Sequence, residues 1–436
     1  MVSEIRCGRR TAIKTLVSTG LATSQLVGSV SSKESSKFIT ENAAKTIAQR
    51  RIFFYSQVRE DHRHWSGAVP GEPTLYYEQD SNNKYRPAVY VFPVERHSFF
   101  TSKIVGHITI SANRQRPPVI EYGNSNPPSS NLKQAKQKIK EVGASSTGRL
   151  LYQGGLRFGI QTSDDEMVDL KGQRRIPIRN SSEPLAVQST DIDVKSEWDR
   201  LTSRSSIPEA EYRSYSGVSL DFDDYAWDGH YGEGDPVGDI GDGNLDYPAS
   251  RGMEPDSWDS WDGCNPIAGT QIIMYHEGWP NNDENVEKRE EICDALHHLM
   301  DTDDEGWSKT QNVDDGIDEI SDELGFLDNS YNGENEHNIS KKLVRSQIDS
   351  GRPFMLTNYK LPDIPNPFGK PEIQTKDRPR TNKKKGNNYN GHAIVGAGYH
   401  EGSTMEIDVY DGWENYRQTL TYGAWDLTAM ITKIIP

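Results

Sequence analysis

The sequence is poor in cysteine, in long apolar runs and in basic charge. Its three cysteines, Cys7, Cys264 and Cys293, are too few for a disulfide framework, and they form no C-x-x-C pair of the kind that marks many zinc sites. No stretch approaches roughly 18 consecutive apolar residues, so the sequence predicts no membrane-spanning helix. With 65 acidic and 49 basic residues, the formal charge is -16. Non-specific nucleic-acid binding needs a basic surface, so this charge argues against it.

What the chain does contain points to a folded, acidic protein. The 9 Trp, 20 Tyr and 11 Phe supply material for a core. The length of 436 residues exceeds a typical domain of roughly 100–200 residues, which predicts two domains and a terminal segment. The acidic excess suits solubility in high salt, where ions screen self-repulsion, as in halophilic proteins. An ordinary acidic protein explains the same charge equally well.

The first 36 residues have the composition of an export signal. Arg9 and Arg10 precede Lys14 and a weakly hydrophobic run, and no acidic residue lies between Glu4 and Glu34. This pattern resembles a twin-arginine signal, although Ala12 stands where Phe is common. The resemblance implies a secreted or cell-surface protein. The alternative is a surface helix that happens to contain Arg-Arg.

Composition divides the rest of the chain into two parts with a connection between them. Residues 45–171 predict a small α+β domain, with strands at 85–94, 103–111, 149–162 and 167–170 and a solvent-facing helix at 131–142. Residues 172–216 are rich in Arg and Ser, contain Pro177 and Pro184, and lose apolar periodicity, which predicts a linker.

Residues 217–436 form the second predicted domain, in which helices precede strands. That order favours an α+β fold over a doubly wound sheet. The predicted helices are 265–276, 284–300, 314–324 and 339–348, and the predicted strands are 353–359, 392–399, 405–410 and 418–422. Helix 265–276 is apolar on several faces, so it is expected to be buried.

Cys264 stands directly before this buried helix and after Gly263. The positive end of the helix dipole favours a thiolate there, and the thiolate is the nucleophilic form of cysteine. The alternative is a small buried apolar residue.

His392 and Asp411 form a candidate catalytic set with Cys264. His392 opens an apolar strand 128 positions after Cys264, and Asp411 ends the next strand. A carboxylate there could orient the imidazole. The order Cys, His, then Asp or Asn, with a Cys–His gap near ~130–150 positions, is that of papain-like peptidases.

The motifs around these residues resemble streptopain-type and bacteriocin-leader-processing-type cysteine peptidases. The similar blocks are Gly263–His276 with Trp279-Pro280, Gly351-Arg-Pro353, Gly391-His-Ala393 and Val409–Trp413, within residues 221–436. The resemblance implies a papain-like domain in which Cys264 is the nucleophile, His392 the general base and acid, and Asp411 the orienting carboxylate. No cofactor is implied.

Two further features follow from the same resemblance. Trp258 stands where such peptidases usually carry a Gln whose amide supports the oxyanion hole; its indole N–H is a donor that could substitute. Segments 106–112, 117–122 and 150–155 are similar to a propeptide-like domain. We therefore expect residues 51–170 to inhibit the peptidase domain until the linker is cut. The alternative is that they form a permanent accessory domain.

The expected function is hydrolysis of peptide or protein substrates through an acyl-enzyme. Two alternatives remain: a catalytically inactive secreted binding module on the same scaffold, and an acyl transferase with the same triad. The sequence contains no G-x-S-x-G, H-E-x-x-H or Walker motif. It therefore does not predict a serine hydrolase, a metallopeptidase or a P-loop protein of the kinds that these motifs mark.

Weaker patterns suggest metal sites. Residues 301–306 resemble the first half of a calcium loop, but its twelfth position is Asn312 rather than Glu, so a polar turn is favoured. His276, Cys293, His297 and His298 lack the spacing of zinc ligands, and Cys293 is expected in the core. Lys383–Lys385 is expected to be a solvated charge run.

Overall fold

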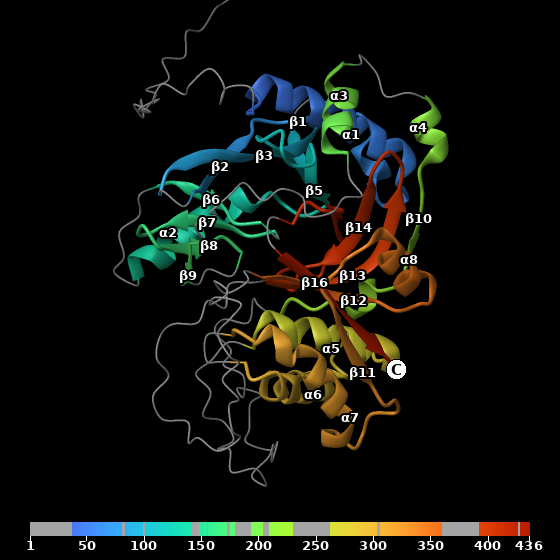
Figure 1. Cartoon of the computed structure of the whole chain (residues 1–436). Helices are drawn as coiled ribbons and strands as arrows, with labels where there is room; N and C mark the ends of the chain where they lie inside the picture. Colours follow the sequence, from blue (N-terminus) through green and yellow to red (C-terminus); the bar gives the residue numbers. More distant parts are fainter. Residues whose placement is uncertain are drawn as a thin grey trace, which may run out of the picture. The chain divides into compact units, whose positions relative to one another are not determined.

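Helices and one large mixed sheet make up the fold, as an α+β sequence predicts (Figure 1). The computed structural model describes residues 37–80, 83–98, 101–141, 148–154, 156–171, 175–178, 193–203, 209–229, 262–302, 306–359, 392–425 and 428–436. The sequence separates into unit 1–36 and a compact unit 37–436, and every described residue belongs to the second. Arg9, Arg10, Trp258 and Lys383–Lys385 lie outside the described residues.

The described strands form a single sheet that runs through both predicted domains. From one edge, the C-terminal strands are β11 (Asn332–Glu336), β16 (Thr428–Ile435), β12 (Phe354–Tyr359), β13 (His392–Glu401), β14 (Met405–Tyr410) and β15 (Gln418–Thr421). The order continues with β5 (Val119–Gly123), β4 (Ser102–Ser111), β3 (Tyr85–His97), β2 (Thr74–Gln79), β6 (Leu150–Tyr152), β7 (Phe158–Gln161), β8 (Glu166–Asp169) and β9 (Arg175–Pro177). Two short strands lie off this path: β1 (Val69–Pro70) pairs with β3, and β10 (Ser216–Ser219) with β13.

The junction between the two parts is the antiparallel pair β5–β15. Gly123 lies opposite Gln418, and Tyr122 lies opposite Thr419. We call residues 37–215 the N-terminal half and residues 216–436 the C-terminal half. Backbone hydrogen bonds therefore join the halves directly.

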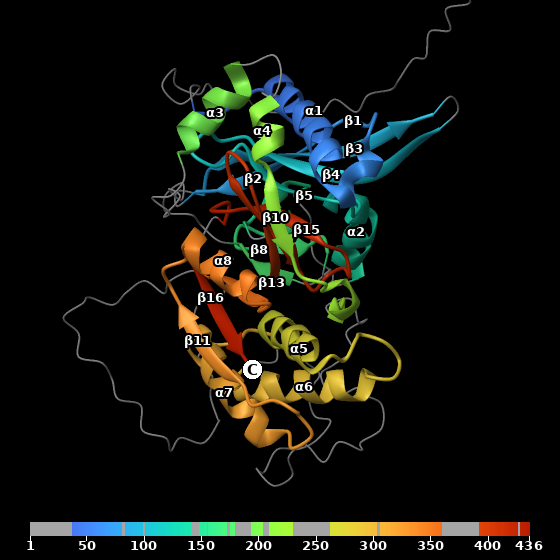
Figure 2. The same cartoon turned by 90° about the vertical axis from the view of Figure 1, so that its right-hand side faces the viewer.

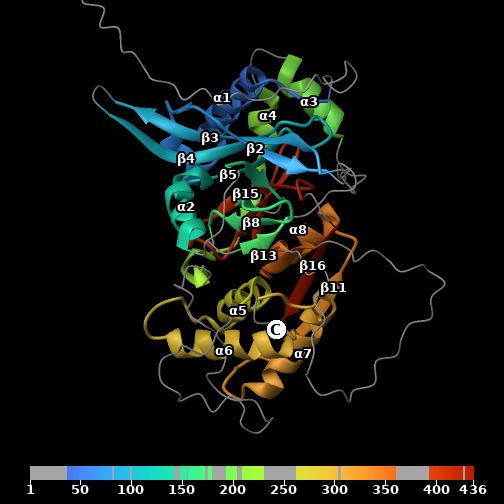
Figure 3. The same cartoon turned by 90° about the vertical axis from the view of Figure 1, so that its left-hand side faces the viewer.

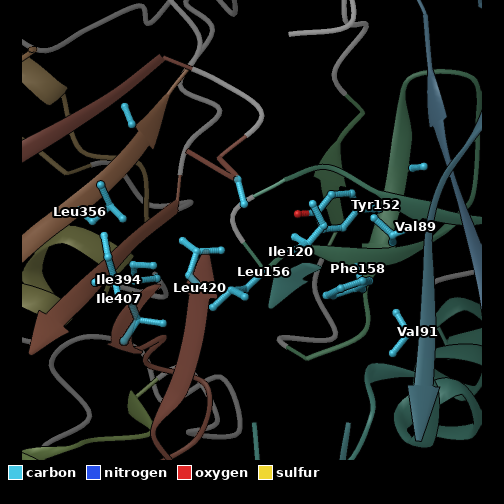
Figure 4. Close-up of a cluster of buried hydrophobic side chains, with 14 of the residues drawn as sticks. Val89, Val91, Ile120, Tyr152, Leu156, Phe158, Leu356, Ile394, Ile407 and Leu420 are labelled. Atoms are coloured by element: carbon cyan, nitrogen blue, oxygen red, sulfur yellow. The ribbon is translucent and has the colours of Figure 1, made fainter. Parts of the chain in front are cut away.

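A shared apolar cluster reinforces this junction (Figure 4). Ile120 and Phe158 of the N-terminal half belong to the same buried cluster as Ile394, Ile407 and Leu420 of the C-terminal half. Full burial of such a side chain stabilises a fold by roughly 1.5–3 kcal/mol. The stability of each half thus depends on the other.

Helices cover the sheet on both faces. Helices α5 (Cys264–Glu277), α6 (Val286–Leu299) and α7 (Val313–Glu323) pack together beside β12, β13 and β16, and α8 (Lys341–Asp349) adds Val344 and Ile348 to the cluster that holds Phe354 and Leu356 (Figures 1 and 2). Over β3 and β4 lies α1 (Glu41–Val58), while α2 (Leu132–Glu141) packs near β8 (Figure 3). Among the described residues, no helix has the length and apolarity to span a bilayer.

The segment predicted as a linker contains two packed helices, α3 (Val194–Ser203) and α4 (Glu209–Ser214). Arg51 of α1 donates to Glu197 of α3 at 3.0 Å and to Glu211 of α4 at 2.8 Å, and all three side chains are buried. Trp198 and Leu201 join the cluster under α1. Both buried ion pairs and apolar contacts therefore hold α3 and α4 against α1. The linker prediction rested on missing apolar periodicity, which does not register buried ion pairs.

Candidate active site

Cys264 is the first residue of α5 and is 4% exposed. The helix is apolar all round, and its residues 264–274 are buried, as predicted. Its N-cap is Gly263, and the Gly263 carbonyl accepts the first intrahelical bond, from Ile267 N at 3.1 Å. The thiol is therefore held where the predicted nucleophile has to be, at the amino end of a buried helix.

Gly263 fixes that position through a conformation that only glycine adopts easily. Its φ is 95° and its ψ is 144°. A Cβ there would lie 2.9 Å from the carbonyl oxygen of Gly306 and 2.9 Å from Thr302 Cγ2. The loop after α6 thus packs directly against the backbone that precedes Cys264.

We expect Gly263→Ala to destabilise the protein and to lower any hydrolytic activity that depends on Cys264. Backbone strain of this kind costs about 1–3 kcal/mol, and the overlap with Gly306 adds to it. Gly278→Ala is the matched control, because Gly278 has a φ of 70° but open space around it; strain alone costs about 1–2 kcal/mol there. Urea unfolding and peptide hydrolysis would be measured for both variants. Equal losses of stability, with unchanged activity in Gly263→Ala, would contradict this account.

His392 is the first residue of β13 and is 1% exposed. Val395 pairs with Tyr410, and continuing this antiparallel register places His392 beside Trp413. The two rings do stack, with centroids 5.9 Å apart and planes at 28°. An indole face against the imidazole excludes water from one side of the ring.

The start of α5 lies against the ends of β12 and β13. Cys264 packs in the same buried cluster as Ala393, the residue after His392. Thr357 Oγ1 of β12 donates to Asn265 Oδ1 at 3.1 Å, and Thr357 is the partner of Ala393 across the two strands. The structure thus brings the sequence neighbourhoods of Cys264 and His392 together.

Asp411 lies directly after β14 and is fully buried, but its oxygens are already engaged. Oδ1 accepts from the backbone N–H of Trp413 at 3.1 Å and of Glu414 at 3.3 Å. Oδ2 accepts from Gln418 Nε2 at 2.9 Å and from Lys171 Nζ at 2.5 Å. A carboxylate offers about four lone-pair sites, so these four bonds use its capacity.

Lys171 was not among the site residues predicted from the sequence. This lysine of the N-terminal half is 3% exposed in its side chain, and the nearby charges of Asp411 and Glu414 raise its pKa although burial opposes this. Its only sequence signal is its place directly after a buried strand. The contact spans 240 positions, so no local pattern could pair the two residues.

Neither protein-family models nor curated proteins match this chain.

The second described thiol, Cys293, is fully buried with Trp227 and Ile267. Burial raises the pKa of the Cys293 thiol well above its usual range, and the negative charges of Asp262 and other nearby acids raise it further. The prediction that Cys293 is a core residue is confirmed. Of the two described cysteines, only Cys264 lies at the start of a helix.

The weaker metal patterns gain no support from the described part of the chain. Within it, no group of three or more His, Cys, Asp or Glu side chains could hold a metal ion. His297 Nδ1 lies 2.8 Å from the carbonyl oxygen of Asp262, and burial lowers the pKa of His276 to about 4. Asp301, at the start of the calcium-like segment, forms an ion pair with Lys309.

Proposed function

We propose that the protein is a papain-like cysteine peptidase in which Cys264 and His392 carry the chemistry. One observation supports this most: a buried helix that begins at Cys264 packs against the strand that begins at His392. A nucleophile at the start of a helix, close to a base at the first position of a strand, is an arrangement suited to acyl transfer. The α+β sheet with its covering helices supplies the rigid frame.

In this proposal the Cys264 thiolate attacks a peptide carbonyl and His392 protonates the leaving amine. The resulting thioester is then hydrolysed by water, which His392 deprotonates, and the thiolate is regenerated. Trp258 is proposed to supply an oxyanion donor. The family resemblance implies Asp411 as the third member of the site; in the structure its carboxylate accepts from Lys171 Nζ at 2.5 Å.

That ion pair is the observation that favours the alternative of an inactive binding module. A carboxylate whose oxygens are all engaged is poorly placed to orient an imidazole. An acyl transferase with the same residues would differ only in its acceptor, so product analysis with an added amine separates transfer from hydrolysis.

The test of the proposal is selective labelling of the thiols. Iodoacetamide should alkylate Cys264 rapidly in the folded protein and leave Cys293 untouched, because Cys293 is fully buried and its pKa is raised. Peptide mapping identifies the labelled residue, and casein hydrolysis should fall in step with labelling. Equal, slow labelling of both thiols would support the inactive scaffold.

We also propose that the chain is exported through its first 36 residues, with Arg9 and Arg10 as the twin-arginine signal. The formal charge of -16 is compatible with a salty extracellular medium. The N-terminal half, similar to a propeptide in sequence, is proposed to remain part of the folded protein because of the β5–β15 pairing.

A further inference from the structure

A buried asparagine beside the proposed base has no hydrogen-bond partner among the described residues. Asn358 lies near the end of β12, is 2% exposed, and neither its Oδ1 nor its Nδ2 makes a hydrogen bond. Buried side-chain amides in native proteins nearly always have partners, so an unpartnered one calls for an explanation.

The strand register places this amide next to the imidazole. Asn358 and His392 are directly opposed in the antiparallel pair β12–β13. Directly opposed side chains project from the same face of a sheet, with Cβ atoms about 4.5–5.5 Å apart. An amide and an imidazole at that separation need only small side-chain rotations to meet.

Asp411, the other candidate acceptor for the imidazole N–H, already has its hydrogen-bonding capacity in use. Asp411 has its four acceptor sites occupied by Lys171, Gln418 and two backbone N–H groups. Freeing one of them would leave a buried ammonium or amide without its partner. Moving Asn358 breaks no bond, because its amide makes none.

We propose that Asn358 is a positioning residue for His392, its amide oxygen accepting the imidazole N–H that is not engaged with Cys264. When the thiolate–imidazolium pair forms, both ring nitrogens carry a proton and both need an acceptor. The Cys264 sulfur takes one, and Asn358 Oδ1 takes the other. Catalytic hydrogen bonds are often open in free enzymes and close in the complex, which accounts for the unmade bond.

This inference rests on the proposed peptidase function, and the test separates the two. Asn358→Leu removes the acceptor at similar volume, and Asn358→Asp keeps an acceptor oxygen in the same place. Asn358→Leu should lower kcat on the order of 10²-fold with little change in KM, as for loss of support to a general base. Asn358→Asp should restore most of the kcat. Alkylation of Cys264 by iodoacetamide at neutral pH should slow in Asn358→Leu and recover in Asn358→Asp.

The matched control is Gln347→Leu in α8. Gln347 is also buried, and its Oε1 also has no hydrogen-bond partner. This variant should leave kcat, KM and Cys264 alkylation unchanged. Neither leucine variant should lower the midpoint of thermal unfolding, because each removes buried polar atoms that have no hydrogen-bond partner: both amide atoms of Asn358 and Oε1 of Gln347.

The outcomes are distinct. If the unmodified protein hydrolyses peptides and Asn358→Leu matches it in kcat and alkylation rate, the positioning role is wrong. A lower kcat in Asn358→Leu that is not restored in Asn358→Asp would also overturn this role. So would a folding defect in both Asn358 variants that the Gln347→Leu control does not show. If the unmodified protein neither hydrolyses peptides nor shows selective Cys264 labelling, the proposed function itself fails.

Discussion

A chain that begins at Ser216 is expected to lose its fold rather than to cleave substrates faster. It would lack β5, so the edge of β15 would be exposed. Unpaired sheet edges promote aggregation. It would also lack Ile120 and Phe158 from the shared apolar cluster.

Buried carboxylates in β14 add to this expected loss. Glu406 accepts from the hydroxyls of Tyr55 at 2.6 Å, Tyr122 at 2.7 Å and Tyr215 at 2.7 Å, all from the N-terminal half. Asp408 accepts from Arg59 at 2.9 Å, and burial opposes ionisation while Arg59 and His400 hold the pKa of Asp408 well below its usual range. Removing one partner of a buried ion pair costs about 3–5 kcal/mol, a large part of a typical stability of about 5–15 kcal/mol.

Circular dichroism and gel filtration of residues 216–436 and 37–436 would test this expectation. The longer chain contains the whole compact unit and should be folded and monodisperse. A folded, monomeric 216–436 with faster hydrolysis, slowed again by added residues 51–170, would contradict it and support a releasable restraint.

The second large effect is expected for Cys264→Ala, which should abolish peptide hydrolysis and leave the fold intact. The side chain lies at the first position of α5, and alanine is a good helix former that needs no new partner. Without the sulfur no acyl-enzyme forms. Casein hydrolysis and urea unfolding would be measured together.

Cys293→Ala is the matched control for this prediction. It removes the other described thiol from a fully buried site, so it should cost some stability through the cavity left behind but retain full activity. Hydrolysis by Cys264→Ala at the unmodified rate would show that the peptidase assignment is wrong. Loss of activity in Cys293→Ala with an intact fold would assign the nucleophile to the other thiol.

Elements with strong apolar patterns could be predicted from the sequence. The predicted helix 265–276 corresponds to α5, and the predicted strand 405–410 coincides with β14. The sequence did not predict β11, whose residues Asn332–Glu336 are all polar or glycine, because that strand exists through its pairing with β16. Helix α1 was missed because apolar and charged residues alternate irregularly along Glu41–Val58.

The candidate site shows the same division between local and distant information. That Cys264 would stand at the start of a buried helix followed from the apolar run after it. The contact between Lys171 and Asp411 could not be predicted in this way, because only the folded sheet brings these two distant residues together. The position of Asn358 opposite His392 required the register of β12 and β13, which short strands leave open in a sequence.

The three tyrosines on Glu406 have a consequence for how the chain folds during its synthesis. They lie 351, 284 and 191 positions before their common acceptor, so none of these contacts can form until nearly the whole chain has left the ribosome. Proteins dominated by such distant contacts fold slowly, because loop closure must precede the stabilising interaction. The N-terminal half is therefore expected to remain incompletely packed until β14 and β15 have been synthesised. That interval is the time at which the newly made protein depends most on chaperones and is most exposed to proteolysis.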